Sequence, residues 1–521
     1  MKFVSDPTIA RKVAAMQQRV RWQHPLIQQL GIDQTRLVLE PAIAPDAAFK
    51  FCVLGDSGNG QHRGDSPQRR VSQLMQSQAS EAKFVLHTGD VVYLVGSSEQ
   101  YQENFIQPYQ ELLVGGSQPQ QIAYNQMVFN QPFLPVLGNH DYYDLPVAYG
   151  LLSQLLWPLK QVFRYHIDLD VGWHGSYQGD AYAQAFLDYL KDVPDAALKA
   201  HLERHYTAQT STGRGLCYQP QKFTRLPNRY YRFRYGGIDF FALDSNTFNA
   251  PRPIGTDASS QQRRQHLIAT RNSAMAQLDT YVQQIKMVDH QPSTVESQDQ
   301  LDELLGQIEQ VEESIRDIEK QLAPQTVDQS IDQAQLDWLY ESLVESWQDS
   351  SVRGRMIYFH HPPYVTEATK WDQGQTLAVR HYLRTVFDRV AQEVSRTQQQ
   401  SIVDLVLCGH AHCFEYLQTL ETGHADRHTQ WVICGGSGFS LRRQRREGHV
   451  LQEEIDGELR DVAISRGFWG KTGHGADKRR TYSFLEVEVS AGEQLQFRLK
   501  PHMVEYQRKK WNPYQVSLAF S

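Results

Sequence analysis

Side chains that can bind metal ions follow five short apolar runs of this sequence, each at the point where the run ends. The first two runs, FKFCVLGD and KFVLHTGD, finish in Asp56 and Asp90. Three later runs finish in GNHD, FHH and GHAH, which bring Asn139, His360 and His410 to the same place. Carboxylate, amide and imidazole groups are ligands of first-row transition metals. Any one of them could be a capping aspartate or a buried histidine, but the ordered set favours a metal site.

These ligands are too many for one ion, and they include a carboxylate, Asp90, that can bridge two. A pair of metal ions about 3.5–4 Å apart can clamp a phosphoryl oxygen and generate a hydroxide nucleophile near neutral pH. The residue types therefore predict a two-metal centre that acts on phosphoric esters.

The runs that carry these residues are typical of buried strands. Each is short and mainly apolar and closes in a polar or glycine-rich turn, as do IDFFALDSN and QWVICGGSG further along the chain. Helical stretches separate them, which predicts an α/β fold with its ligands at the carboxyl ends of the strands. Near the C-terminus, TYSFLEVEV and LQFRLKPHMV alternate like antiparallel strands, and we expect them at the edge of the same core.

A chain of 521 residues is too long for one simple core. We expect an N-terminal helical segment over residues 1–45, with a helix over about 8–31, and a catalytic domain over 46–521. Two insertions interrupt this domain. Residues 142–228 have mixed loop and helix character, and residues 260–335 are helical.

The second insertion carries two apolar seams with spacings that alternate between three and four residues. The polar, turn-rich stretch HQPSTVESQDQ separates them. Such seams on consecutive helices predict an antiparallel coiled-coil hairpin over residues 265–325. It could form a homo-oligomer, grip a protein partner, cover the site or pack on its own domain. The seam residues are Ala274, Leu278, Tyr281, Ile285 and Val288, then Leu301, Leu304, Ile308, Val311, Ile315, Ile318 and Leu322.

Composition and charge limit the partners and the compartment. The net charge of −7 does not suit nucleic-acid binding, which positive charge drives. The N-terminus lacks the apolar core of a signal peptide, and no run approaches the roughly 18 apolar residues of a membrane-spanning helix. The five cysteines are few and unpatterned, which favours a reducing compartment. We therefore expect a cytoplasmic protein without membrane or nucleic-acid partners.

The ordered motifs GDSG, GDVVY, GNHD, FHHPPY and GHAH resemble those of the calcineurin-like metallophosphoesterase family. Within it, the chain resembles the purple acid phosphatase branch. Most of the family has histidine where this chain has Gly58, and the branch has a tyrosine at the place of Tyr93. The resemblance implies a four-layer α/β/β/α fold and an Fe(III) ion bound by the Tyr93 phenolate. The alternative for Tyr93 is a capping aromatic side chain at a strand end.

The resemblance also implies a role for each motif residue. Fe(III) would be held by Asp56, Asp90, Tyr93 and His412. A divalent ion, Fe, Zn or Mn, would be held by Asp90, Asn139, His360 and His410, with Asp90 bridging. His140 would contact the substrate and protonate the leaving oxygen, and Asp141 would orient His140.

Four other features are less directly assigned. His361 would contact the phosphate or be held by the backbone, and Arg63 follows the first turn, from where it could reach the substrate. His87 precedes its turn and is expected to be a strand residue. The arginine-rich stretch LRRQRREGH would favour an anionic substrate if it overhung the site, but we expect a solvated surface loop.

Together these observations predict a phosphomonoesterase similar to acid phosphatases. A metal-bound hydroxide would attack phosphorus directly in a phosphorylated small molecule or protein. One alternative is a phosphodiesterase or nucleotide hydrolase with the same site. An alternative of another class is an interaction scaffold with a coiled-coil arm and a vestigial site, against which the complete ligand set argues.

Overall fold

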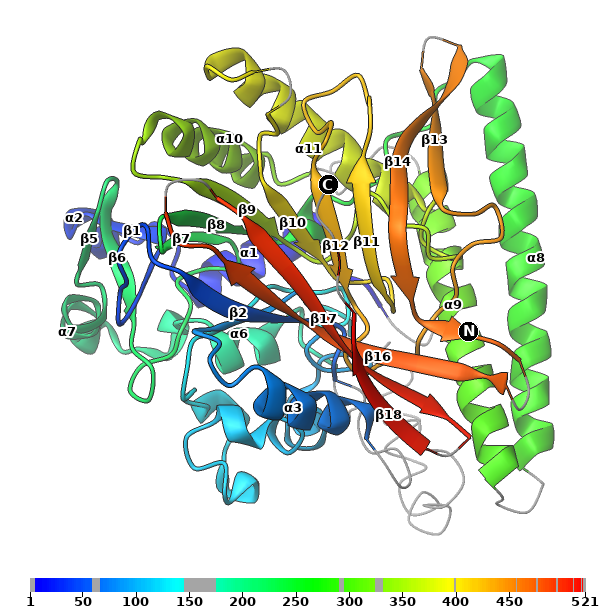
Figure 1. Ribbon diagram of the computed structural model, residues 1–521, viewed down its shortest axis with the longest axis horizontal. Helices are drawn as coiled ribbons and strands as arrows, with labels where there is room; N and C mark the ends of the chain where they lie inside the picture. The colour runs from blue at the N-terminus through cyan, green and yellow to red at the C-terminus, as the bar shows by residue number, and fades with distance from the viewer. Residues whose placement is uncertain are drawn as a thin grey trace.

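Two β-sheets form the centre of the molecule, and helices lie on the outside of both (Figure 1). The computed structural model describes residues 5–58, 66–144, 175–289, 295–323, 331–397, 400–455, 457–474, 477–492, 495–508, 510–516 and 518. This arrangement is the layered α/β fold that the sequence predicted.

The larger sheet has 11 strands, and its central strands are the predicted apolar runs. Neighbours β8, β9, β10 and β12 are parallel, so their carboxyl ends meet at one edge. The strands in spatial order are β13 (Val450–Ile455), β14 (Glu458–Trp469), β11 (Phe414–Thr419), β12 (Gln430–Cys434), β10 (Leu405–Cys408), β9 (Gly354–Tyr358), β8 (Ile238–Ala242), β7 (Tyr231–Tyr235), β1 (Ile32–Leu39), β6 (Gly213–Tyr218) and β5 (Ala208–Thr210).

The smaller sheet has seven strands, of which β2, β3 and β4 are parallel neighbours. Its order is β18 (Lys510–Gln515), β17 (Phe497–Gln507), β16 (Arg479–Val489), β2 (Phe49–Leu54), β3 (Val85–His87) and β4 (Phe133–Pro135), and β15 (Lys471–Thr472) pairs with β16. The expectation that these C-terminal strands lie at an edge is wrong for both, since β17 lies between β16 and β18, and β16 is also an inner strand. The strand β16 pairs with β2 on one side and β17 on the other, which explains its almost continuous burial.

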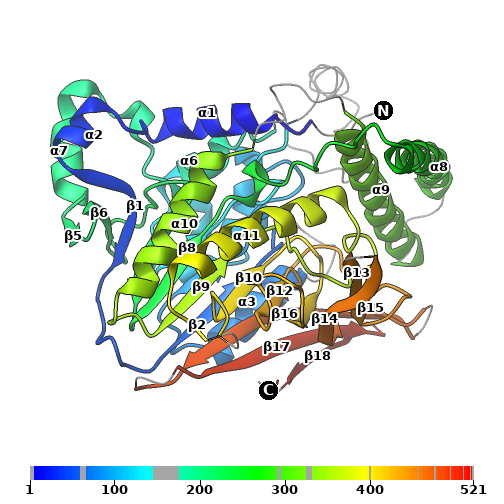
Figure 2. The ribbon, with the colours of Figure 1, turned by 90° about the horizontal axis from the view of Figure 1, so that it is seen from above.

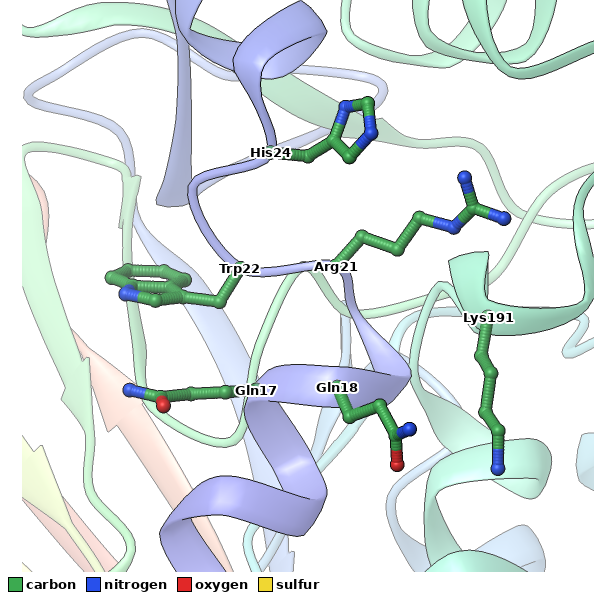
Figure 3. A pocket seen from close by; sticks show the side chains of 6 residues that line it. All are labelled: Gln17, Gln18, Arg21, Trp22, His24 and Lys191. Atoms are coloured by element: carbon green, nitrogen blue, oxygen red, sulfur yellow. The ribbon is translucent and has the colours of Figure 1, made fainter. Parts of the chain in front are cut away.

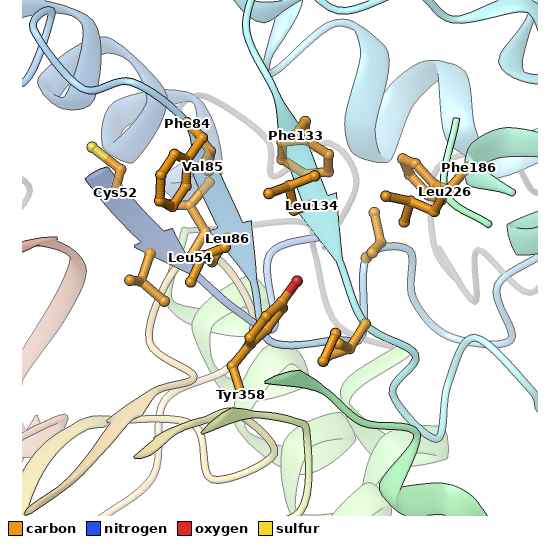
Figure 4. Close-up of a cluster of buried hydrophobic side chains, with 14 of the residues drawn as sticks. Cys52, Leu54, Phe84, Val85, Leu86, Phe133, Leu134, Phe186, Leu226 and Tyr358 are labelled. Atoms are coloured by element: carbon orange, nitrogen blue, oxygen red, sulfur yellow. The ribbon is translucent and has the colours of Figure 1, made fainter. Parts of the chain in front are cut away.

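Aromatic side chains fill the space between the two sheets. Phe51 of β2 lies edge-on to Phe240 of β8, with ring centroids 5.6 Å apart, and Phe84 contacts Phe233 of β7 in the same way. In Figure 4, Tyr358 of β9 projects from the larger sheet toward Leu54 and other side chains of β2 and β3. Aromatic rings bury 150–250 Å² each and dominate such cores. This core fixes the two sheets, and hence their strand ends, relative to each other.

Helices cover the outer faces of both sheets. The helices α10 (Gln333–Gln348) and α11 (Gly374–Glu393) pack on the larger sheet through a second core, in which Leu339 and Val379 join Ile357 of β9. The helix α3 (Pro67–Gln78) packs on β16 and β17 of the smaller sheet. Ser66 caps its first turn, and Pro67 occupies the first helical position, where proline is favoured.

The N-terminal segment contains two short helices and a strand. The helices are α1 (Ile9–Arg19) and α2 (Pro25–Gln29), because Arg21 and Gln23 adopt left-handed backbone angles and His24 caps a new helix at Pro25. The strand β1 then runs parallel to β6 and β7 within the larger sheet. The apolar pattern over about 8–31 thus predicted helix through a break, and it did not predict β1.

The segment predicted as the first insertion, 142–228, also adds strands to the larger sheet. It contains α6 (Asp180–Phe186), α7 (Asp195–His205), β5 and β6, together with the short helix η6 (Leu190–Asp192). Short helical turns fill the segment between β3 and β4, and another follows β8. They are η1 (Ser98–Gln100), η2 (Gln102–Ile106), η3 (Gln110–Leu112), η4 (Pro119–Gln121), η5 (Tyr124–Gln126) and η7 (Ser245–Thr247).

The segment predicted as the second insertion forms the helices α8 (Ala258–Asp289) and α9 (Val295–Leu322), which pack against each other. Both views place this pair at one end of the molecule, with β5, β6 and α7 at the other (Figures 1 and 2). The seam side chains Ala274, Leu278, Leu304 and Ile318 are buried. The helix α9, however, also packs on α11, so it belongs to the body of the molecule. Among the described residues, no helix has the length and apolarity needed to cross a membrane.

Candidate metal centre

The carboxyl ends of five strands from both sheets meet at the candidate site. Asp56, Asp90 and Asn139 follow β2, β3 and β4 of the smaller sheet. His360 and His410 follow β9 and β10 of the larger one. All five side chains are buried, with at most 4 % of each residue exposed. The packing of the two sheets therefore brings together residues that lie up to 354 positions apart in the sequence.

One cluster forms around the hydroxyl group of Tyr93. This hydroxyl lies 2.9 Å from Asp56 Oδ1, 2.8 Å from Asp90 Oδ2 and 3.3 Å from His412 Nε2. The Tyr93 ring is stacked on Phe439, with 3.8 Å between ring centroids. The four polar side chains of this cluster are those that the resemblance assigns to Fe(III).

A second cluster forms around His360 Nε2. This nitrogen lies 3.0 Å from Asn139 Oδ1, 3.2 Å from Asp90 Oδ2 and 3.2 Å from His410 Nδ1. The other ring nitrogen of His360 lies 2.8 Å from the backbone oxygen of Thr88, which fixes Nδ1 as the protonated nitrogen. The residues of this cluster are those that the resemblance assigns to the divalent ion.

Asp90 belongs to both clusters through the same oxygen atom, Oδ2. Burial and neighbouring charges shift the pKa values of the groups around it. Burial raises the pKa of Asp56, and the charge of Asp90 raises it further. Burial alone would lower the pKa of His360, but the Asp90 and Asp56 carboxylates and the Thr88 carbonyl together outweigh it and raise this pKa to about 9. Burial lowers the pKa of His410 to about 3, with a further contribution from Lys370. Two buried carboxylates thus lie beside imidazoles that differ in their affinity for protons.

The residues at this centre fit two metal ions. Their donors are carboxylate, amide and phenol oxygens and imidazole nitrogens, the set that suits iron, zinc and manganese. Ligand atoms of Asp56, Asp90 and His360 lie within 4.8 Å of one another, as do those of His360, His361 and His410. Buried charges of this kind are ordinarily paired or bind metals, because isolated charges are costly to bury.

The backbone at the centre is strained. Asp56, Asp90 and His410 have φ angles of 53°, 54° and 67°, in the left-handed region that residues other than glycine rarely adopt. Strain of this kind costs about 1–3 kcal/mol per residue and clusters at functional sites. Three predicted ligands therefore have a conformation that local preference disfavours and the surrounding structure maintains.

Gly58 is required by close packing. A Cβ atom at this position would lie 2.0 Å from the backbone oxygen of Val91 and 2.6 Å from Val92 Cα. The backbone N–H of Tyr93 donates to the Gly58 carbonyl oxygen at 2.8 Å. A histidine could not occupy position 58 with this backbone, and the same contact holds the residue that brings its hydroxyl group to Asp56.

His140 lies beside both clusters, and its neighbours orient it. Its ring stacks obliquely on Tyr93, with centroids 4.3 Å apart, and its Nδ1 lies 2.5 Å from the backbone oxygen of Leu94. Its Nε2 lies 4.0 Å from Asp90 Oδ2. Asp141 does not bind the His140 ring as expected. Its carboxylate accepts the backbone N–H groups of Asp90, Val91 and Gly138, so it orders the turn that carries Asp90.

The other predicted residues have different outcomes. His361 is held on both sides of its ring, by Ser245 Oγ at 2.9 Å and by Asn249 Nδ2 at 3.3 Å, and its centroid lies 4.4 Å from that of His410. His87 is a buried residue of β3 whose Nε2 lies 2.8 Å from Ser57 Oγ. Arg63 lies outside the described residues.

The arginine-rich stretch is only partly the solvated loop that we expected, because Arg446 is exposed but two other arginines are buried. Arg442 is only 6 % exposed and Arg445 only 8 %. Arg445 stacks on Trp371 and donates to two backbone carbonyl groups, and Arg442 donates to Ser440 Oγ. Since the Ser440 carbonyl oxygen lies 3.0 Å from His412 Nδ1, this stretch packs behind the Tyr93 cluster.

Sequence reasoning missed three residues at the centre. Phe439 follows the GGSG turn after β12 and stacks on Tyr93, a place that its position after a glycine-rich strand end could have suggested. Lys370 and Glu313 lie near His410, and neither belongs to a motif. Only the fold brings them to the site.

A depression elsewhere on the molecule does not share this chemistry. It has a volume of about 520 Å³ and lies between α1, α2 and η6. The described residues that line it include no carboxylate and one imidazole, so they do not make a metal centre. The side chains drawn in Figure 3 are Gln17, Gln18, Arg21, Trp22, His24 and Lys191.

Comparisons with solved structures give low similarity over most of the chain. A purple acid phosphatase from yellow lupin (Lupinus luteus) seeds is 11 % identical, with a TM-score of 0.39, over 91 % of this chain and 55 % of the lupin chain. This chain thus spans little more than half of the lupin enzyme. GAP50, the anchor in the inner membrane complex of Plasmodium, is 11 % identical, with a TM-score of 0.37, over 91 % and 89 %. PhoD is 10 % identical, with a TM-score of 0.35, over 92 % and 74 %.

The family comparison is more specific. No curated protein matches the sequence. Residues 49–249 match the calcineurin-like phosphoesterase family. This region contains β2, β3 and β4 and the predicted ligands that follow them. Residues 49–249 of this chain are therefore similar to a calcineurin-like phosphoesterase domain.

Proposed function

We propose that this protein is a phosphomonoesterase that uses two metal ions. The observation that carries the proposal is the position of Asp90 Oδ2, 2.8 Å from the Tyr93 hydroxyl group and 3.2 Å from His360 Nε2. One carboxylate oxygen between two ligand clusters is the arrangement that a bridged pair of ions requires. When bound, such a pair turns water into a hydroxide nucleophile and neutralises the phosphoryl oxygens.

The ligand assignment follows the two clusters. Asp56, Asp90, Tyr93 and His412 would hold the ferric ion. Asp90, Asn139, His360 and His410 would hold a divalent ion, Fe, Zn or Mn. The steric requirement for Gly58 and the position of the Tyr93 hydroxyl support assignment to the purple acid phosphatase branch.

His140 is proposed as the general acid. The Leu94 carbonyl oxygen can only accept a hydrogen bond, so the Nδ1 atom of His140 carries a proton. The Nε2 atom is then the nitrogen that gives a proton to the leaving oxygen of the ester. Asp141 has an indirect role, because its carboxylate accepts the backbone N–H groups of Asp90 and Val91 and so holds the turn on which they lie. His361, which packs beside His410, and Arg63 stay proposals as contacts of the phosphate.

The test is a visible spectrum and an elemental analysis of the purified protein, followed by activity assays. We expect about two metal ions per chain and a violet phenolate-to-iron band that Tyr93→Phe abolishes. We also expect faster hydrolysis of p-nitrophenyl phosphate than of its bis-ester, between about pH 4 and 9.

Three results would contradict parts of this proposal. A colourless enzyme that is active with manganese would remove the ferric assignment and leave the family. Faster hydrolysis of the bis-ester would favour a phosphodiesterase. Failure to hydrolyse either ester, with metals bound, would favour the alternative of a scaffold with a vestigial site.

A further inference from the structure

The inserted hairpin docks on the metal centre through a stripe of polar residues on α9. This stripe has the same three-and-four spacing as the apolar seam but lies on another face of the helix. Along it, side chains meet the core from β15 to the N-terminal segment. The contacts are Glu303 with Lys471 and Lys478, Glu313 with His410 and Lys370, Asp317 with the backbone of Gly374 and Gln375, and Lys320 with Asp6.

Glu313 lies at the centre of this stripe, against a predicted metal ligand. Its Oε1 atom is 3.0 Å from His410 Nε2, and its side chain is only 13 % exposed. The other nitrogen of the same ring, Nδ1, faces His360 Nε2 at 3.2 Å. Glu313 therefore lies behind the His410 ring, on the side away from the cluster around His360.

We propose that Glu313 fixes His410 in the tautomer that binds the divalent ion, so that the inserted hairpin completes the metal centre. This inference rests on the proposed two-metal function. A histidine that binds a metal through one nitrogen commonly donates the N–H of the other to a carboxylate, which sets the tautomer and the ring orientation. Glu313 is a positioning residue in this sense.

The neighbours of His410 make the choice of tautomer sensitive to Glu313. Lys370 Nζ lies 3.2 Å from His410 Nε2, and Gln375 Nε2 lies 3.0 Å from it. The Lys370 ammonium group can only donate, and the Gln375 amide presents its NH₂ group, so without Glu313 these donors would turn Nε2 into an acceptor and move the proton to Nδ1. A protonated Nδ1 has no lone pair for a metal ion. With Glu313 present, Lys370 and Gln375 donate to its carboxylate instead.

The remaining contacts of the stripe hold Glu313 in place. Asp317, one turn further along α9, accepts the backbone N–H groups of Gly374 and Gln375 at 2.8 and 2.9 Å. This carboxylate caps the first turn of α11 from outside the helix. Lys370 lies in the loop before α11, and Gln375 lies in the first turn of α11. The contact of Asp317 with this turn therefore positions α9 and the neighbours of His410 relative to each other.

The test compares metal affinity in the full-length protein and in variants of Glu313. Zn²⁺ affinity is measured by competition with a chromophoric chelator, and the violet band reports the Tyr93 cluster separately. We expect Glu313→Ala to weaken one Zn²⁺ site by roughly 10–100-fold, the usual effect of losing such a partner. The violet band should stay. We expect a smaller loss in Glu313→Gln, whose amide oxygen can still accept from His410.

The matched control is Glu303→Gln, which removes the contacts with Lys471 and Lys478 from the same helix without touching His410. It should keep the wild-type Zn²⁺ affinity. Unchanged affinity in Glu313→Ala would overturn the inference alone, as would an equal loss in Glu303→Gln. A wild-type protein that binds no metal would overturn the proposed function, and the inference with it.

Discussion

The backbone at Gly58 passes so close to Val91 that only glycine fits at this position of the candidate metal centre. A Cβ atom would lie 2.0 Å from the Val91 oxygen, a distance that real Cβ atoms do not show. The close approach lets the Tyr93 N–H bond to the Gly58 carbonyl oxygen. The side chain of Tyr93 then reaches Asp56 and Asp90.

We expect Gly58→Ala to destabilise the protein and to perturb the Tyr93 site. Overpacking of a tight interior costs about 1–3 kcal/mol, and here the clash is with backbone, which cannot rotate away. Urea unfolding should therefore show a lower midpoint, and the violet band should shift or weaken. Gly255→Ala is the control, because its Cβ would meet only the side-chain ends of Asp257 and Ser260. Equal stability of the two variants would contradict this account.

At the scale of elements, the helix α9 packs against two different parts of the molecule through two faces. Its apolar seam packs on α8, and its polar stripe packs on the catalytic core. The Asp317 carboxylate is central to the second of these contacts, since it bonds to two N–H groups of α11 that otherwise lack partners within that helix.

We expect Asp317→Ala to loosen the hairpin. Loss of a capping carboxylate typically costs about 1 kcal/mol, and the buried N–H groups of Gly374 and Gln375 would lose their acceptor. Amide hydrogen exchange should become faster in α9 and in the first turn of α11. Asp279→Ala, on an exposed position of α8, should leave exchange unchanged. If α9 exchanges its amide hydrogens at the wild-type rate in Asp317→Ala, then other contacts are enough to hold the hairpin on the core.

The hairpin also shows what the sequence could and could not predict. The spacing of Leu304 and Ile318 predicted its helices, because burial along a seam repeats with the helical period. The polar stripe has the same period, but polar residues are ordinarily solvated, so nothing local marks Glu313 as a neighbour of His410. The motif residues were easier to assign, because each Asp or His lies within a few residues of the end of an apolar run. Their convergence depends on the packing of two sheets, which no single motif encodes.

Across the whole molecule, the residues of the candidate metal centre come from both sheets. Asp56, Asp90 and Asn139 follow strands of the smaller sheet, and His360 and His410 follow strands of the larger one. Bound ions would therefore link the sheets and stabilise the folded state, by an amount that grows with metal concentration relative to its dissociation constant.

Protons bound to His360 and Asp56 make the stability of the metal-free protein depend on pH. The folded-state pKa of His360 is raised to about 9, from an ordinary value of 6.5. Its contribution to metal-free stability is fully present below pH 6.5 and is lost as the pH rises through 9. The raised pKa of Asp56 acts with the same sign, since its contribution is also lost as the pH rises. For His360 the difference in pKa corresponds to about 3 kcal/mol of folding free energy.

We therefore expect the stability gap between metal-loaded and metal-free protein to widen from pH 6 to pH 8.5. Metal binding must displace the proton that His360 holds in the metal-free centre, and this displacement costs less as the pH rises toward the His360 pKa of about 9. Melting temperatures with and without a chelator, measured across this range, test the expectation. In Asp90→Asn the stability gap between metal-loaded and metal-free protein should be small at every pH, because a neutral amide replaces the carboxylate that both clusters share. A wild-type gap that stays constant or narrows would show that these protons do not compete with the metal ions.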